Sequence, residues 1–132
     1  MKRTLLFISV IAVFAGLSIA QDDAAYTAAM KAVNASNRPL RAAIMAKDTA
    51  AAAAEAGKIA TAFDTVTAYW TAKKVDDAIA LAKTAHDAAK TIADSTDADA
   101  QSAALMKLSG TCNACHMAHR GPGAGPGQFV IK

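Results

Sequence analysis

Two cysteines and a histidine near the C-terminus are the residues of this chain whose types and spacing are best suited to chemistry. They form a C-x-x-C-H run, Cys112-Asn113-Ala114-Cys115-His116. This pattern is typical of c-type haem attachment, in which the two thiols add across the two haem vinyl groups. The adjacent imidazole then serves as the proximal ligand of the iron. The run therefore predicts Cys112 and Cys115 as haem thioethers and His116 as an iron ligand.

The spacing of these three side chains has a physical reason if the run is helical. Residues three and four positions apart share one helix face, so Cys112, Cys115 and His116 would project from the same side. Gly121 followed by Pro122 is a typical signal for the end of such a helix. One face of a C-terminal helix would thus present both thioethers and the ligand.

Three other interpretations of the cysteines stay open. A C-x-x-C pair also occurs in thioredoxin-like redox proteins, but that motif expects a βαβ setting and no strand pattern is found here. Zinc needs four ligands in tetrahedral array, and the available set has no familiar spacing: Cys112, Cys115, His119 and His86. A disulfide between the two thiols is the simplest structural alternative. The histidine directly after Cys115 and the signs of export favour haem.

The N-terminus has the three parts of a secretory signal peptide. Lys2 and Arg3 are followed by an apolar run over 5–19, a small-x-small site ending at Ala20, and a polar continuation from Gln21. This predicts a cleaved signal peptide over residues 1–20 and a periplasmic protein that starts at Gln21. The run is short for a membrane span, although an uncleaved anchor remains the alternative. No other membrane segment is predicted after cleavage.

Charge and composition limit the classes of function that can be expected of this chain. Without Lys2 and Arg3, twelve basic residues remain against 11 acidic ones, a formal net charge of +1. Two haem propionates would bring this to about −1, because a cofactor's own charge must be counted. No Lys/Arg cluster of the kind that binds nucleic acid stands out. No paired catalytic carboxylates or activated nucleophile are visible, so the chain is not expected to be an enzyme.

Alanine dominates the composition and large apolar residues are scarce. Alanine favours helix and lets helices approach closely, but each alanine buries little area. A small domain with so limited a side-chain core is marginally stable on its own. A covalently held haem would complete this core.

The periodicity predicts an all-α fold, an antiparallel four-helix bundle over residues 21–120 with the haem near the C-terminal helix. Asp48 is a good N-cap for the second helix. Pro39 either bends the first helix, or a new helical segment begins just before it with Asn37 as its N-cap. The Gly/Pro-rich tail, residues 121–132, is expected to be flexible. The expected helices run approximately over 23–46, 48–68, 73–93 and 95–120.

An exported, all-helical chain with C-x-x-C-H in its last helix resembles the class II c-type cytochromes, the cytochrome c-prime family with its low-spin relatives. In that family the motif is followed, after two residues, by an aromatic residue and then Arg or Lys. Here Met117 and Ala118 are followed by His119 and Arg120. The resemblance implies that Arg120 contacts a propionate or the haem edge. His119 departs from the family pattern.

The resemblance also suggests which residue is the sixth iron ligand. In the low-spin relatives a methionine of the first helix binds the iron, and Met30 lies where that residue is expected. A thioether there raises the reduction potential and closes the iron to gases. The prediction is a His116/Met30 carrier of single electrons that meets redox partner proteins in the periplasm. The alternative is a five-coordinate haem that binds NO or CO, with Met30 as a pocket wall.

Two further histidines have side chains that suit an iron ligand. His86 would give bis-histidine ligation, although a half-exposed structural histidine is the simpler interpretation. His119 is one helical turn from His116, so it cannot reach the opposite side of the same iron. Beside a propionate it would instead make the potential depend on pH. The resemblance further allows a homodimer through the first two helices.

Overall fold

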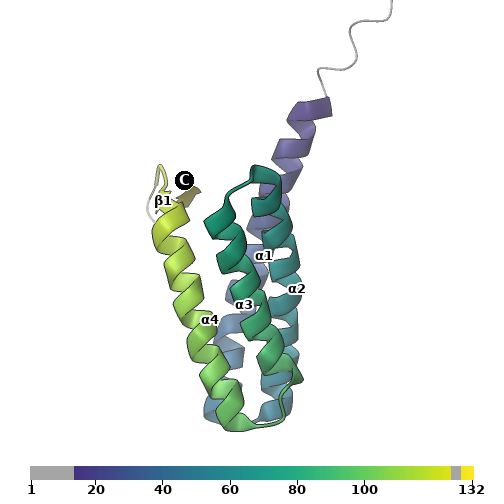
Figure 1. Ribbon diagram of the computed structural model, residues 1–132, viewed down its shortest axis with the longest axis vertical. Helices are drawn as coiled ribbons and strands as arrows, with labels where there is room; N and C mark the ends of the chain where they lie inside the picture. The colour runs from purple at the N-terminus through teal and green to yellow at the C-terminus, as the bar shows by residue number, and fades with distance from the viewer. Residues whose placement is uncertain (1–13, 126–128) are drawn as a thin grey trace, which may run out of the picture.

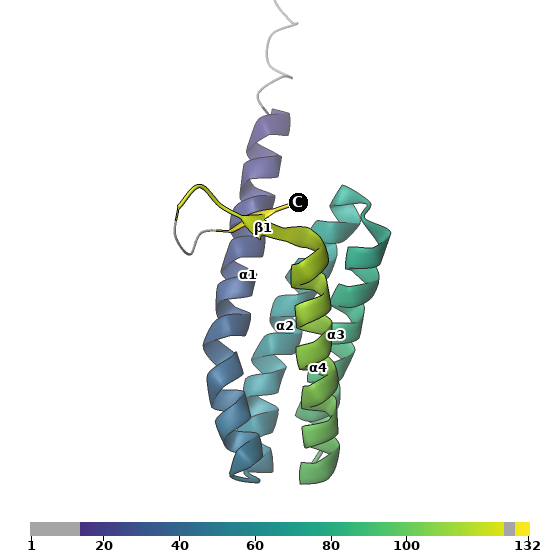
Figure 2. The ribbon, with the colours of Figure 1, turned by 90° about the vertical axis from the view of Figure 1, so that its left-hand side faces the viewer.

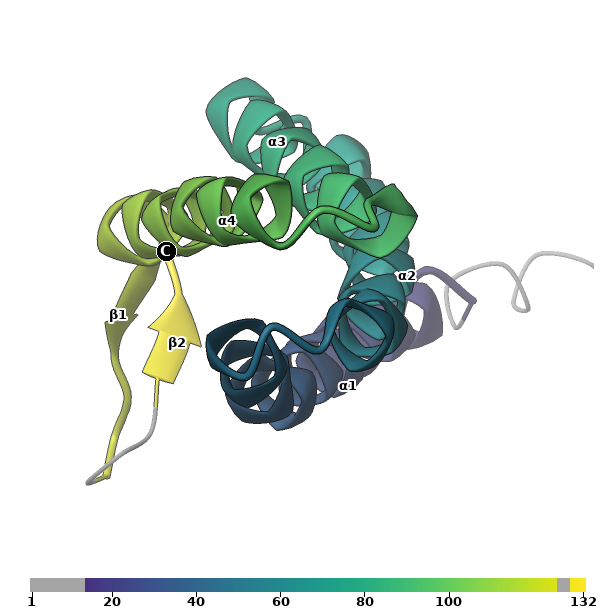
Figure 3. The same cartoon turned by 90° about the horizontal axis from the view of Figure 1, so that it is seen from below.

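The protein is an all-α bundle of four antiparallel helices in up-down-up-down order, as the sequence predicts (Figure 1). The computed structural model describes residues 14–125 and 129–132. Helix α1 spans Phe14–Met45, α2 Thr49–Lys73, α3 Asp76–Asp94 and α4 Ala98–His119. Seen from below, the helices follow one another around the bundle from α1 to α4 (Figure 3).

Short, capped connections join the helices and set their antiparallel order. The Asp48 carboxylate accepts a hydrogen bond from the Ala51 amide at 2.9 Å, so the predicted cap of α2 is confirmed. Asp97 caps α4 in the same way through the Ala100 amide at 2.7 Å. Each carboxylate satisfies a backbone donor that has no partner within its helix.

Helices α1 and α2 differ from the sequence expectation. Helix α2 continues past residue 68 because Tyr69 and Trp70 are buried in the core. It ends where Lys74 adopts the left-handed conformation, with φ of 57°, and its amide bonds the carbonyls of Thr71 and Trp70. Helix α1 is continuous through Pro39, so no fresh segment begins at Asn37.

Alanine packs the interface between α2 and α3, where the helices share most contacts. Seven of these alanines are at most 2 % exposed: Ala52, Ala56, Ala78, Ala82, Ala85, Ala88 and Ala89. The larger core side chains Leu40, Ile59 and Ile92 fill the space between these small residues. Helices α1 and α4, by contrast, share few contacts. The bundle is therefore least tightly closed along the edge between its first and last helices.

The C-terminal tail contains a short β-hairpin that the sequence analysis does not predict. Strand β1, Arg120–Pro122, pairs antiparallel with β2, Phe129–Ile131, and Gly121 lies opposite Val130. The Lys132 amide also donates to the His119 carbonyl at 2.9 Å. A Cβ at Gly121 would come within 2.9 Å of Lys132 Cε, the end of a flexible side chain that can shift aside. The missed signal was the Phe-Val-Ile run, which favours a strand.

The predicted signal peptide lies mostly outside the described residues. Residues 1–13 are not described, and residues 14–20 form the first turns of α1. Among the described helices, none is both long enough and apolar enough to cross a membrane.

Candidate functional site

The C-x-x-C-H run is helical and presents its three reactive side chains to one cavity inside the bundle. Cys112, Cys115 and His116 line this cavity from α4, and Met30 lines it from α1. The predicted proximal and distal ligands therefore line the same cavity from two different helices. The cavity has a volume of about 90 Å³.

The remaining cavity wall is mainly apolar. Helices α2 and α3 supply Phe63, Val66, Leu81, Ala82 and Ala85, and α1 adds Val33. Polar groups come from the two helices that flank the open edge: Tyr26, Asn34, Asn37 and Thr111. The sequence analysis did not identify these wall residues, because their convergence depends on how the helices pack.

Both cysteines are free thiols, and their surroundings keep them protonated. Burial raises the pKa of Cys112, and the neighbouring Cys115 raises it further, while the Arg41 guanidinium partly opposes this. Burial also raises the pKa of Cys115, with a second contribution from the Asp77 carboxylate. Neither thiol is an activated thiolate of the kind used by redox or nucleophilic cysteines.

His116 is largely exposed, yet it is held in its neutral form. Partial desolvation lowers the pKa of His116, and the nearby Arg120 guanidinium lowers it further. A neutral imidazole has the free nitrogen lone pair that a metal ligand needs. Arg120 itself ends α4 and is not part of the cavity wall. It lies close enough for its charge to affect His116 and Tyr26.

An aromatic cluster supports the end of the cavity near Tyr26. The Tyr26 ring lies 4.3 Å from that of Tyr69 and 5.9 Å from that of Trp70, measured between centroids. His119 packs against Trp70 at 5.1 Å and places Nε2 2.9 Å from Asp77 Oδ2. His119 thus adds a ring to this cluster and also joins α4 to the start of α3.

Arg41, which the sequence analysis did not single out, joins α1 to α4 beside the cavity. Its Nη2 donates to Ser109 Oγ at 2.8 Å, and its Nε donates to Asn37 Oδ1 at 3.0 Å. Its charge acts on Cys112. The four-residue step from Asn37 is the sequence signal that could have placed Arg41 next to the cavity stripe.

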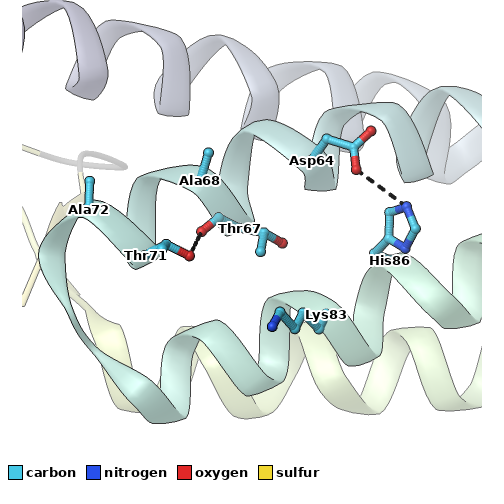
Figure 4. A pocket seen from close by; sticks show the side chains of 7 residues that line it. All are labelled: Asp64, Thr67, Ala68, Thr71, Ala72, Lys83 and His86. Atoms are coloured by element: carbon cyan, nitrogen blue, oxygen red, sulfur yellow. Dashed lines mark hydrogen bonds and ion pairs between the residues drawn. The ribbon is translucent and has the colours of Figure 1, made fainter.

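His86 lies away from the cavity, so bis-histidine ligation is not supported. It borders a separate open hollow between α2 and α3 (Figure 4), where its Nε2 is 3.4 Å from Asp64 Oδ1. Its Nδ1 lies 3.1 Å from Asp87 Oδ1. The simpler interpretation of His86 as a half-buried structural histidine is the one that fits.

The competing interpretations of the cysteines find no support in the described part of the chain. No three His, Cys, Asp or Glu side chains converge there as a metal-binding group, so the alternative zinc set is not brought together. The two thiols are not joined in a disulfide. The β-hairpin at the end of α4 is not a βαβ unit, so a thioredoxin-like setting is also absent from the described residues.

The donor set at this cavity fits a covalently attached haem. It offers two neutral thiols, a neutral imidazole and a thioether around an apolar wall. The volume of about 90 Å³ is smaller than a porphyrin, so the surrounding side chains or helices must move apart to admit one. The loosely packed edge between α1 and α4 is where the bundle can open at least cost.

No known protein family, curated protein or solved structure matches this chain.

Proposed function

We propose that this protein is a periplasmic c-type cytochrome that carries single electrons and is not an enzyme. In this proposal Cys112 and Cys115 hold one covalent haem, His116 is the proximal iron ligand and Met30 the distal ligand. The observation that carries the proposal is that Met30 and the C-x-x-C-H run line one cavity from two helices. A haem bound there would supply reversible one-electron chemistry at its iron.

The two thiols have the protonation state that attachment requires. Each S–H would add across one vinyl double bond, with the sulfur forming a C–S bond and the hydrogen a C–H bond on the neighbouring carbon. The addition of a thiol to a vinyl group needs no oxidant. Because Cys112 and Cys115 are one helical turn apart, both thiols can act from the same helix face.

His116 and Met30 have complementary roles in this proposal. The lowered pKa of His116 keeps its imidazole neutral and able to donate a lone pair near pH 7. Met30 is half-buried against the core cluster, where its flexible thioether can adjust to a metal. The apolar wall of Phe63, Val66 and Leu81 would limit water at the site.

Arg120 is the residue proposed to meet the cofactor's carboxylates or edge. It is exposed at the end of α4, and its charge acts on His116. A guanidinium suits such a role because it binds carboxylates with two parallel hydrogen bonds.

The second candidate function is a five-coordinate haem that binds NO or CO. The observation that favours it is the apolar wall around Met30, because a small apolar gas gains from such surroundings. In that case Met30 is a wall residue and not a ligand.

An optical spectrum of the purified exported protein tests the proposal. It should be recorded in the ferric and dithionite-reduced states, with and without CO. Sharp low-spin bands that do not respond to CO would support the electron carrier. A broad high-spin spectrum that shifts strongly with CO would support the gas-binding function. A colourless protein from cells able to mature c-type cytochromes would refute both.

A further inference from the structure

The charges of this chain are distributed unevenly around the bundle. From residue 24 to 47 there are four basic residues and no acidic ones, and from 100 to 132 there are three basic and no acidic. From 48 to 99 there are five basic and nine acidic residues. By the helix bounds, α1, α4 and the hairpin through Lys132 together carry six basic and three acidic residues, whereas α2 and α3 together carry four basic and six acidic ones. The formal net charge of +3 for the whole chain does not reveal this uneven distribution of charges.

The basic side of the bundle is formed by α1 and α4. These two helices flank the cavity and share few contacts with each other. We call this side the α1/α4 face: α1 from Ala24, α4 from Ala100, and the hairpin. Figure 2 shows α1 and α4 on either side of α2, with the hairpin reaching across from the end of α4. Six basic residues of this face are exposed: Lys31, Arg38, Arg41, Lys107, Arg120 and Lys132.

Two arginines lie close to residues of the cavity wall without lining it. Arg41 bonds Ser109 across the edge and acts on Cys112, and Arg120 acts on His116. Between residue 20 and the C-terminus every arginine is on this face, while α2 and α3 carry only lysine. Arginine is the cation most suited to carboxylates, because its planar fork binds both oxygens at once.

Two of the carboxylates near this face, those of Asp77 and Asp23, are already paired. Asp77 of α3 acts on Cys115 but lies 2.9 Å from His119 Nε2. Asp23 accepts a hydrogen bond from Tyr69 and lies 3.6 Å from Lys73 Nζ. Asp99 is confined to the first turn of α4. These groups therefore reduce the positive potential of the face only locally.

Exposed apolar side chains gather on the same face. Within residues 23–125 and 130–132, every exposed large hydrophobic side chain belongs to α1, α4 or β2: Met45, Met106, Met117, Val130 and Ile131. Methionine and arginine are enriched in protein–protein interfaces. Nucleic acids and anionic membranes are instead bound by dense basic clusters, whereas the cations here are spaced along two helices. The mixture favours a protein as the occupant.

We propose that the α1/α4 face is the docking surface for a protein partner whose contact patch is rich in carboxylates. This inference rests on the proposed function for the partner's role as electron donor or acceptor. Long-range attraction would guide the acidic patch to the two helices that contribute Met30 and His116 to the cavity. The acidic α2/α3 side would repel the same partner, so the two sides together select one orientation.

Fluorescence anisotropy with a labelled decaglutamate peptide tests this surface without depending on the haem. The α1 double variant Lys31→Glu/Arg38→Glu is compared with the α2/α3 double variant Lys58→Glu/Lys83→Glu. Both pairs change the net charge equally and exchange residues of similar helix propensity. Circular dichroism establishes that both variants are folded.

The inference predicts that the α1 variant binds the peptide about tenfold more weakly than the unmodified protein in low salt. The α2/α3 variant should bind within about twofold of it, and added salt should remove the difference. Equal weakening by both variants, or a larger effect at α2/α3, would overturn the proposal. So would binding to phosphatidylglycerol vesicles with no binding to the peptide.

Failure of this inference is distinguishable from failure of the proposed function. The optical spectra of the same samples report the haem, and the peptide affinities report the surface. Haem-containing protein with no preference between the two sides would refute the docking surface alone. Selective peptide binding by a protein that contains no haem would refute the proposed cytochrome function alone.

Discussion

Met30 of α1 and His116 of α4 line the same cavity, although they belong to the first and last helices of the bundle. Met30 is half-buried against the core, and His116 lies at the exposed end of the attachment run. This relationship turns two separate sequence hypotheses, one for each side of the iron, into one site that mutagenesis can test.

The Met30→Ala variant is expected to lose the low-spin spectrum and to shift its reduction potential downward. The reason is that a thioether ligand stabilises the reduced iron, and alanine cannot replace it. Optical spectroscopy and redox titration measure both effects. Met45→Ala is the matched control, because Met45 is 85 % exposed and not part of the cavity wall. An unchanged spectrum in Met30→Ala would remove Met30 from the ligand set.

Replacing the cysteines should separate covalent attachment from haem binding. The Cys112→Ser and Cys115→Ser variants should each retain one thioether, and the double variant should release its haem on denaturation. These two residues are the chain's only cysteines, so no other thiol can substitute. Haem staining after denaturing electrophoresis measures the attachment. Stain retained by the double variant would show that the thiols do not hold the cofactor.

Tyr26 should make the protein less stable at alkaline pH. Burial, followed by the neighbouring Cys115, raises the pKa of Tyr26 to about 12. The folded state then keeps a proton that the unfolded state loses above about pH 10. The contribution of Tyr26 is thus fully present below pH 10 and is lost as pH rises towards 12.

Urea unfolding between pH 9 and 12 measures this effect. The Tyr26→Phe variant keeps the ring in the aromatic cluster and removes the titrating hydroxyl. Its free energy of unfolding should fall less steeply over this range than that of the unmodified protein. Parallel curves for the two proteins would contradict the assignment to Tyr26.

Gln101 should be important for stability although it is remote from the cavity. It is 1 % exposed, and its amide nitrogen lies within 3.0 Å of three backbone carbonyls, those of Thr49, Ile92 and Ser95. Gln101→Ala leaves these acceptors unsatisfied and should lower the free energy of unfolding by about 2 kcal/mol. Chemical denaturation measures the loss.

Ser102→Ala provides the control for Gln101, because Ser102 is the exposed neighbour on the same helix turn. It should change the free energy of unfolding by less than about 0.5 kcal/mol. If the free energy of unfolding fell by similar amounts in the two variants, the buried amide network would contribute little to stability.

Local spacing in the sequence was sufficient to predict the helices and the attachment run. The N-cap Asp48 and the one-face arrangement of Cys112 and Cys115 both involve residues within a few turns of one another. Such interactions depend on the 3.6-residue period and on nearby backbone donors, which the sequence displays directly.

The contacts between helices could not be predicted in this way. The Arg41–Ser109 hydrogen bond, the His119–Asp77 contact and the Gln101 network join residues far apart in the chain. Their formation depends on the rotation and tilt of each helix within the bundle. The β-hairpin was missed for a related reason, since its strands are stabilised by pairing with each other across the turn.

The amino-acid sequence by itself determined the reactive groups of this protein, their order on one helix face and the number of helices. Only the tertiary structure decided that Met30 faces the same cavity as His116, that His86 does not, and that arginines lie close to residues of its wall. The physical reason is that a side chain's chemistry is local, whereas its neighbours are set by the packing of alanine-rich helices against one another.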